Sequence, residues 1–358
     1  MREEGACKKK RMLKIGIIGC GFMGKMHANC YRLMKDVKVM GVYDIHEERA
    51  KEVATLTGAK IYDHPDALIN DKEIDAINIC TPTYLHKEYI IKCAMAGKHI
   101  FCEKPLAFSA DDAEEIIEEV QKSKVKLMVG MVLHFWPEYV EFKKIVHSNK
   151  YGKLTTLTCT RLSSHPVFGW DKWYSDPKRS GGAVLDLHIH DVDFIFHLLG
   201  KPTAVYSSGR KTARGWEHVY TIYDYYEGAV VAAAEAGWDM AQSFGFVMAI
   251  RGTFEDGTVV EYNSKNQPLV VYGKKKSELV AVEEAAVAAT SLGEKEAEIG
   301  GNISQLSGYY NELKYWVECL KNDRAPEGVT AKEVKIVLEI INSELKSLET
   351  GEKITLLP

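Results

Sequence analysis

Short apolar runs and helical patterns alternate along the first third of the chain. Apolar runs predict strands at residues 13–18, 37–43, 75–80 and 99–102. Helical spacing is found at residues 23–35, 47–56, 86–95 and 110–124, and Ser109 is the expected N-cap of the last of these helices. Strands that alternate with helices of this size predict a parallel, doubly wound sheet.

The pattern changes after Lys126. β-Branched and aromatic residues reach the density of strands at residues 154–162, 204–210, 219–226, 230–236, 246–251 and 258–262. The last two runs flank Asp256-Gly257, which is a hairpin signal. Because few helices separate these runs, we expect a largely antiparallel sheet, followed by helices at residues 309–320 and 331–348.

The predicted fold class is therefore α/β, with two domains. A doubly wound parallel sheet is expected over residues 12–130, and an α/β domain with a large antiparallel sheet over residues 131–358. Residues 283–301 are rich in Ala, Glu and Gly and are expected to form a mobile connection. The chain length of 358 residues and the apolar content of 46% suit two domains with substantial cores.

Charge and cysteine content limit the classes of partner and the cellular compartment that we expect. A net charge of −4 gives no electrostatic case for nucleic acid or an acidic membrane, and no apolar run is long enough to span a bilayer. The polar start of the chain, residues 1–11, lacks the apolar core of a signal peptide, so we do not expect secretion. We expect a disordered leader there, with Met12 as a candidate start. The eight cysteines form no C-x-x-C pair, which favours reduced thiols in the cytoplasm.

One glycine-rich segment indicates a nucleotide site. Gly19-Cys20-Gly21-Phe22-Met23-Gly24 follows the first predicted strand and opens the first predicted helix, and Asp44 closes the next strand. The glycines allow a pyrophosphate to approach the helix N-terminus, and Asp44 would accept hydrogen bonds from a ribose diol. A 2′-phosphate would meet like charge at Asp44, so NAD is favoured over NADP. The alternative is a glycine turn in a fold that has lost its cofactor.

Two further features lie at the ligand-binding edge of this sheet. Thr81-Pro82 follows the strand predicted at residues 75–80, at the edge where such folds bind ligands. His86 begins the next helix, and either contacts a ligand or packs and caps that helix.

The segment that begins at Gly181 predicts a helix with two faces. Apolar residues recur at helical spacing at Leu185, Ile189, Val192, Phe196 and Leu199. Acid and base groups recur on a neighbouring stripe at Asp186, His190, Asp193 and His197. A row of carboxylates and imidazoles beside a buried face suits acid–base catalysis. His188 is expected on another face in a structural role, and because helical residues two apart diverge, no metal site is expected there.

These motifs together resemble the Gfo/Idh/MocA oxidoreductases. The resemblance is carried by the glycine loop, Thr81-Pro82 with His86, Gly97-Lys98-His99, Glu103-Lys104-Pro105, the segment from Gly181 to His190 and the closing run from Tyr310. It implies a Rossmann domain, a second domain with an open-faced sheet, binding of NAD or NADP, and oxidation or reduction of a sugar or cyclitol. It also implies a homodimer or homotetramer formed through that sheet, and a catalytic set of Lys104, Asp186 and His190.

Physical chemistry is consistent with these roles. Neutral His190 can take a proton from a hydroxyl as hydride leaves carbon. Asp186 would orient the His190 ring or hold a neighbouring hydroxyl, and Lys104 would hydrogen-bond the developing alkoxide. Glu103 is expected near the nicotinamide end of the cofactor.

Two residues bear on the substrate. His134 stands where family members often carry Arg, and is expected to line the substrate pocket. Trp173, in the run 170–174, would either wall a sugar site or plug the space between the domains. Two other functions stay open: a redox-neutral NAD-using glycosidase or epimerase, and a non-catalytic nucleotide-sensing protein. The joint presence of Lys104, Asp186 and His190 counts against the second.

Overall fold

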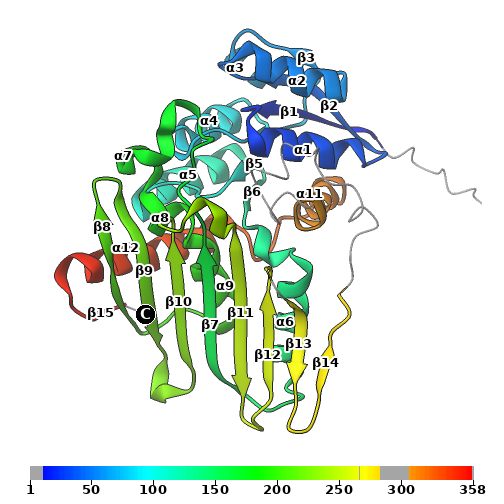
Figure 1. Ribbon diagram of the computed structural model, residues 1–358. Coiled ribbons are helices and arrows are strands. Elements are labelled where there is room, and N and C mark those ends of the chain that lie inside the picture. The colour runs from blue at the N-terminus through cyan, green and yellow to red at the C-terminus, as the bar shows by residue number, and fades with distance from the viewer. Residues whose placement is uncertain (1–10, 266, 283–305, 357–358) are drawn as a thin grey trace, which may run out of the picture.

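The computed structural model describes residues 11–265, 267–282 and 306–356 (Figure 1). The expected leader, apart from Arg11, and the expected connection over residues 283–301 lie outside the described residues.

The first sheet is parallel and has the order β3-β2-β1-β4-β5-β6. Its strands are β1 (Leu13–Ile18), β2 (Val37–Tyr43), β3 (Lys60–Ile61), β4 (Ala76–Ile79), β5 (His99–Glu103) and β6 (Leu127–Gly130). Its helices are α1 (Phe22–Arg32), α2 (Glu47–Thr57), α3 (Pro65–Ile69), η1 (Thr83–Leu85), α4 (His86–Met95) and α5 (Ala110–Ser123). All four residues of β4 and of β6 are buried, as expected where helices cover both faces of a parallel sheet. The predicted doubly wound sheet is confirmed.

The second sheet has nine strands in the order β14-β13-β12-β11-β7-β10-β9-β8-β15. The strands are β7 (Leu154–Leu162), β8 (Ala204–Thr212), β9 (Gly215–Asp224), β10 (Val231–Gly237), β11 (Val247–Phe254), β12 (Val259–Asn263), β13 (Gln267–Tyr272), β14 (Ser277–Leu279) and β15 (Ile354–Thr355). Only the β7–β10 pair is parallel among the described pairs, so the prediction of a largely antiparallel sheet is confirmed.

Helices cover one face of this second sheet. They include α6 (Pro137–Ser148), α8 (Gly182–Asp186) and α9 (Ile189–Leu199). The short helices η2 (Val132–His134), η3 (Trp170–Ser175) and α7 (Pro177–Ser180) lie in the segments that connect these elements, while η4 (Tyr226–Gly228) and η5 (Gln242–Phe244) are short turns between strands. In Figure 1, α6 and α9 lie behind the sheet, and the face toward the viewer carries no helix of the described residues. Burial alternates along β9, as expected for a sheet with one covered face.

The two C-terminal helices pack against the first domain as well. α11 (Leu306–Lys321) lies against α1, and α12 (Ala331–Thr350) lies against α5, α9 and β8. The Trp316 ring on α11 is fully buried, with its centroid 6.4 Å from that of Phe101 on β5. Lys335 on α12 forms an ion pair with Glu114 on α5. The chain therefore returns to the first sheet after completing the second.

Candidate active site

The three glycines of the loop between β1 and α1 have different tasks. Gly19 has a φ of +92°, and a Cβ there would lie 2.6 Å from the carbonyl oxygen of Cys80. A Cβ on Gly24 would lie 2.0 Å from the carbonyl oxygen of Gly19, so this position admits no side chain. A Cβ on Gly21 would meet no protein atom within 4 Å. Gly19 and Gly24 thus permit close packing, and Gly21 leaves the approach to the loop open.

The N-terminus of α1 is suited to a pyrophosphate. Its N-cap, Gly21, offers no side-chain cap, and no acidic residue stands in the first turn. The amides of Phe22 and Met23 therefore lie at a helix N-terminus that favours an anion. The hydroxyl oxygen of Thr81, next to Gly19, is buried without a hydrogen-bond partner in the described structure. These residues fit a dinucleotide.

Asp44 at the end of β2 is tied to the same loop. Its Oδ2 accepts a hydrogen bond of 2.7 Å from the amide of Cys20, and its Oδ1 accepts one of 2.8 Å from the amide of His46. A carboxylate has about four acceptor positions, so Asp44 keeps capacity for a ribose diol.

The ring of His86 contacts the backbone of two loops. It is 1% exposed, and its Nε2 and Nδ1 lie 2.8 Å from the carbonyl oxygen of Thr81 and 2.7 Å from that of Pro105. Neither ring nitrogen remains for a cofactor. Of the two sequence-based roles, this placement supports packing and not direct ligand contact, and His86 connects the Thr81-Pro82 turn to the Glu103-Lys104-Pro105 segment.

Lys104 and Asp186 bring the two domains together. Although they are 82 residues apart, Lys104 Nζ donates to the backbone oxygen of Asp186 at 2.7 Å and to its Oδ1 at 3.1 Å. Their side chains are 16% and 10% exposed, so the pair is shielded but reachable. Lys104 follows β5 of the first domain, whereas Asp186 ends α8 of the second.

The predicted single helix from Gly181 is wrong, because it is interrupted at Leu187 and His188. α8 ends at Asp186 and α9 begins at Ile189, and the amide of His188 donates to the carbonyl oxygen of Ala183, five residues back, at 2.9 Å. Such a wide turn shifts the residues after it around the helix axis. The four polar residues therefore do not form one continuous stripe.

Consequently, Asp186 does not orient the ring of His190. No hydrogen bond joins these two side chains within the described structure, and Nδ1 of His190 is buried without a partner. Burial, together with the positive charges of Lys104 and Arg161, lowers the pKa of His190 well below its usual value of 6.5. The imidazole is therefore neutral at physiological pH, the form that accepts a proton.

Two buried interactions fix the backbone on either side of His190. Arg161 on β7 holds Asp191 through two hydrogen bonds, Nε to Oδ2 at 2.9 Å and Nη2 to Oδ1 at 3.0 Å. His188, fully buried, has its Nε2 3.2 Å from the hydroxyl of Tyr223 and 3.2 Å from Oε2 of Glu344. The expected structural role of His188 agrees with this placement. Sequence reasoning missed Arg161 and Glu344, although an arginine in a half-buried strand is itself a signal of a buried partner.

Glu103 is bound to the protein by both carboxylate oxygens. It is 6% exposed, its Oε1 lies 2.9 Å from Nε2 of His27, and its Oε2 accepts a 3.3 Å hydrogen bond from the amide of Lys104. Nδ1 of His27 lies 3.0 Å from the side-chain amide nitrogen of Asn78. This network supports the backbone that carries Lys104. The position of Glu103 near the nicotinamide stays a prediction.

The two residues predicted to contact substrate are largely covered. His134 has a 5% exposed side chain, and its Nε2 lies 2.8 Å from Oδ2 of Asp193 on α9. Trp173 is 8% exposed and lies against Tyr174, with ring centroids 4.0 Å apart. For Trp173, this burial supports an aromatic plug between the domains, because little of its ring remains to meet a sugar.

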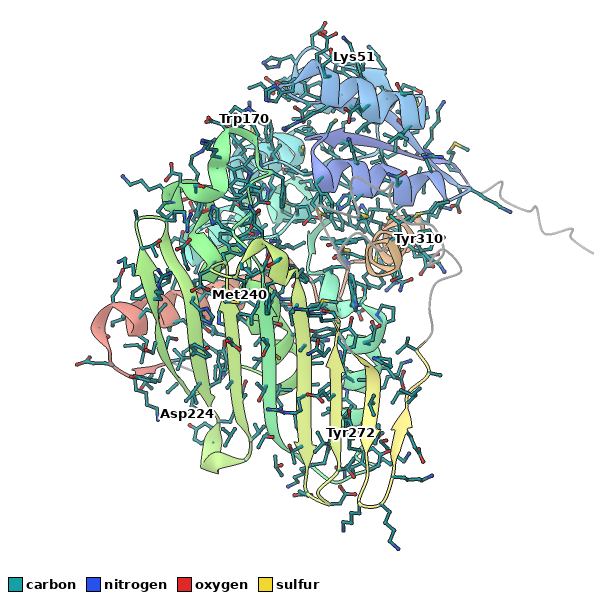
Figure 2. All side chains as sticks on the ribbon, in the orientation of Figure 1. Lys51, Trp170, Asp224, Met240, Tyr272 and Tyr310 are labelled. Carbon is teal, nitrogen blue, oxygen red and sulfur yellow. The ribbon has the colours of Figure 1, made fainter. Side chains whose placement is uncertain are left out.

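A segment of the second domain lies across the nucleotide loop. Phe168 has its ring centroid 6.1 Å from that of Phe22, and Trp170 lies 6.0 Å from His46, next to Asp44. Arg179 Nη2 donates to the hydroxyl of Tyr84 at 3.0 Å. Figure 2 shows Trp170 beside the first domain, well above the second sheet. The sequence offered a plug between the domains as one role of the run 170–174, but did not indicate the contacts of Phe168 and Arg179.

In residues 11–265, 267–282 and 306–356, no group of three His, Cys, Asp or Glu side chains is placed to hold a metal ion. No helix in the same ranges has the length and apolarity to cross a bilayer. The cysteines of these ranges are all free thiols, most of them buried.

Two protein-family models match consecutive parts of the chain. The one described as "Oxidoreductase family, NAD-binding Rossmann fold" matches residues 13–131. The one described as "GFO/IDH/MocA C-terminal domain" matches residues 139–275.

Individual relatives agree with these matches. A myo-inositol 2-dehydrogenase of Thermotoga maritima is 34% identical over 191 residues, covering 53% of this chain and 55% of that protein, so the chain spans about half the length of such curated relatives. A scyllo-inositol 2-dehydrogenase (NAD(+)) of Bacillus subtilis is 26% identical over 97% of both proteins. The crystal structure of a myo-inositol dehydrogenase from Corynebacterium glutamicum shares the fold, with a TM-score of 0.79 at 20% identity, over 97% of this chain and 99% of that one. The chain belongs to the Gfo/Idh/MocA oxidoreductase family, with an NAD-binding Rossmann domain followed by the family's C-terminal domain.

Proposed function

We propose that this protein is an NAD-dependent dehydrogenase or reductase that acts on a hydroxyl or carbonyl group of a sugar, cyclitol or related polyol. The observation that carries the proposal is the meeting of Lys104 and Asp186 across the two domains, beside a neutral His190. The open glycine loop with Asp44 supplies the cofactor site. The three relatives described above are all named as inositol dehydrogenases, which supports the substrate class.

Each of the three side chains has a separate role in the proposed hydride transfer. Bound NAD supplies the hydride acceptor. His190 takes the proton of the substrate hydroxyl, because its lowered pKa keeps the imidazole neutral. Lys104 donates a hydrogen bond to the same oxygen as negative charge develops on it. Asp186 holds the Lys104 ammonium in position and can accept a hydrogen bond from a neighbouring substrate hydroxyl.

Lys104→Ala is the direct test. Removing a donor to a developing oxyanion costs roughly 10²- to 10³-fold in kcat, and we expect a loss of this size in turnover assays. NAD should still bind to the variant, as measured by isothermal titration calorimetry. Lys87→Ala, which removes a lysine paired with Asp112 on the outer helices of the same domain, is the matched control and should keep full activity. Full activity of the Lys104 variant would contradict the assignment.

The substrate is found by screening sugars, cyclitols and sugar acids with NAD and with NADP. Net reduction of the nicotinamide, followed by absorbance, supports the dehydrogenase. Product formation without net reduction would instead indicate the redox-neutral glycosidase or epimerase.

We also propose that the protein forms a homodimer or homotetramer through the uncovered face of the second sheet. Tyr206, Tyr220, Ile222 and Val231 on β8, β9 and β10 are 42–57% exposed there. Exposed apolar patches of this kind are typical of contact surfaces. Tyr220→Lys with Ile222→Lys should shift the protein to monomer in analytical ultracentrifugation, and an unchanged mass would contradict the proposal.

The thiols and the net charge of the chain bear on its cellular compartment and on nucleic-acid binding. We propose that the protein works in the cytoplasm, supported by the free thiols, and takes no nucleic-acid partner, supported by the net charge of −4. A shift of labelled DNA or RNA in a gel at physiological salt would contradict the second point.

A further inference from the structure

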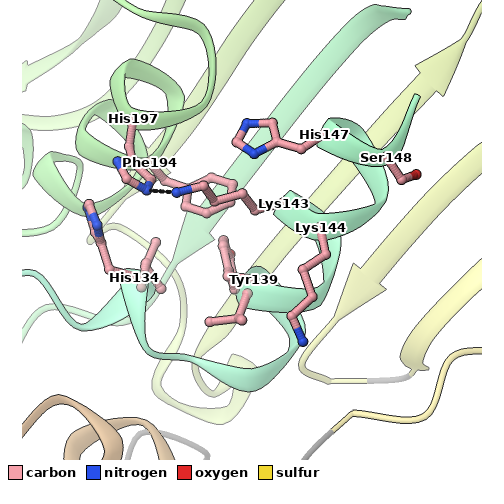
Figure 3. A pocket seen from close by; sticks show the side chains of 10 residues that line it. His134, Tyr139, Lys143, Lys144, His147, Ser148, Phe194 and His197 are labelled. Carbon is pink, nitrogen blue, oxygen red and sulfur yellow. Dashed lines mark hydrogen bonds between the residues drawn. The ribbon is translucent and has the colours of Figure 1, made fainter. Parts of the chain in front are cut away.

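A separate pocket lies between α6 and α9, on the helical side of the second sheet (Figure 3). Its volume is about 430 Å³, within the range of small-molecule sites. The residues that line it are Leu133, His134, Tyr139, Val140, Lys143, Lys144, His147, Ser148, Phe194 and His197. On α9, His197 lies two helical turns, roughly 10 Å, beyond His190, so this pocket is distinct from the candidate active site.

The groups that point into this pocket are basic. Lys143 Nζ donates a hydrogen bond to Nε2 of His197, and Figure 3 shows the His147 ring beside them. The His134 ring lies behind, with its centroid 4.0 Å from that of His197. Lys144 is different, because its amine points away in Figure 3 and pairs with Glu141 at 3.0 Å.

The positive charge in this pocket lacks a counter-charge. In the described residues, no carboxylate forms an ion pair with Lys143, His147 or His197, and the one buried carboxylate nearby, Asp193, is paired with His134. Burial lowers the pKa of Lys143. Burial, with the charges of His134, Lys143 and His147, lowers the pKa of His197 to about 3. An anion bound beside Lys143 and His197 would offset this burial and favour their charged forms.

We propose that this pocket binds the phosphate group of a small molecule, at a site separate from the site of hydride transfer. Phosphate offers several acceptor oxygens to the Lys143 ammonium, in charge-assisted hydrogen bonds, and to an N–H group of the neighbouring His147 ring. The pocket volume leaves room for a group the size of a sugar beyond the phosphate. The inference does not depend on the dehydrogenase activity.

The test is calorimetric titration of NAD-saturated protein with inorganic phosphate and with glucose 6-phosphate, at constant ionic strength. NAD fills the glycine loop, which is itself an anion site. We expect one bound phosphate per chain, binding at least tenfold weaker in Lys143→Gln and in His147→Gln, and restored binding in Lys143→Arg. Lys144→Gln is the matched control and should bind like the unaltered protein.

Nuclear magnetic resonance supplies a second readout. Phosphate should raise the pH at which the His197 ring titrates, since a nearby anion favours the imidazolium. Tighter binding of glucose 6-phosphate than of phosphate means that the pocket also contacts the sugar, and equal binding means that it recognises phosphate alone; both support the proposal. Absence of binding, binding unaffected by Lys143→Gln, or binding abolished by Lys104→Ala would overturn it.

Discussion

The buried pair of Arg161 and Asp191 provides a prediction with a defined magnitude. The two side chains are 4% and 0% exposed and share two hydrogen bonds of 2.9 and 3.0 Å. Besides Asp191, the guanidinium has the Met248 sulfur at 3.7 Å as its described hydrogen-bond partner. Asp191→Leu therefore leaves a buried cation without compensation. We expect a loss of about 3–5 kcal/mol in the free energy of unfolding, a large part of the roughly 5–15 kcal/mol typical of a domain.

Urea unfolding followed by tryptophan fluorescence measures this loss. With a slope of about 2–3 kcal/mol per molar urea, the midpoint should fall by roughly 1–2 M. Arg161→Met combined with Asp191→Leu removes both charges and should recover most of the loss, because no unpaired ion remains. The control is Arg251→Met, whose side chain is 56% exposed and 3.9 Å from Glu261; its effect should stay within about 1 kcal/mol.

Two outcomes would refute the reasoning. A midpoint for Asp191→Leu close to that of the unaltered protein would mean that the buried cation finds other compensation. A double variant as unstable as the single one would mean that packing, and not the unpaired charge of Arg161, causes the loss.

Four shorter predictions concern the cofactor and the proton acceptor. Gly21→Val should fold normally but bind NAD at least tenfold more weakly by calorimetry, whereas Gly24→Ala should lower thermal stability, because its Cβ would lie 2.0 Å from the carbonyl oxygen of Gly19. Asp44→Ser should raise the KM for NAD more than the KM for NADP in initial-rate assays, and an unchanged ratio would count against the ribose contact. Because the pKa of His190 is lowered, kcat/KM should stay level from about pH 7.5 to about pH 6, and a decline centred near 6.5 would contradict this. Below pH 6.5 the unfolded chain takes up a proton on this histidine before the folded chain does, so the free energy of unfolding decreases as the pH is lowered. His190→Gln should lessen that decrease, as measured by urea unfolding at several pH values.

The sequence predicted those parts of the fold whose signal is local and strong. The strands β1 and β2 are largely apolar runs, each with one lysine near its start, and their bounds were predicted as observed. The missed strands include the four-residue β6 and the six-residue β13, which follow regions where the sequence pattern changes or is irregular. They also include β3, which has two residues, and the edge strand β14, which is exposed throughout. An edge strand faces water on several sides, so its sequence shows no alternation to read.

The candidate active site was likewise predicted where its signal is local and missed where it depends on distant residues. The glycine loop and Asp44 were predicted because the spacing that marks a dinucleotide site lies within one βαβ unit, and the loop geometry fits that interpretation. The pairing of Asp186 with His190 was inferred from uniform helical spacing, which one wide turn at His188 invalidates. The bond between Arg161 and Asp191 joins a strand to a helix, and no periodicity within either segment indicates it.

The packing of the C-terminal helices on the first sheet has a consequence for biosynthesis. The chain emerges from the ribosome from its N-terminus, so β5 and α1 are made long before α11. Until residues 306–321 have been made, the surface around Phe101 that Trp316 covers stays open to water. The NAD-binding domain therefore finishes burying its own core only when the last helices arrive, and newly made chains carry exposed apolar surface of the kind that chaperones bind.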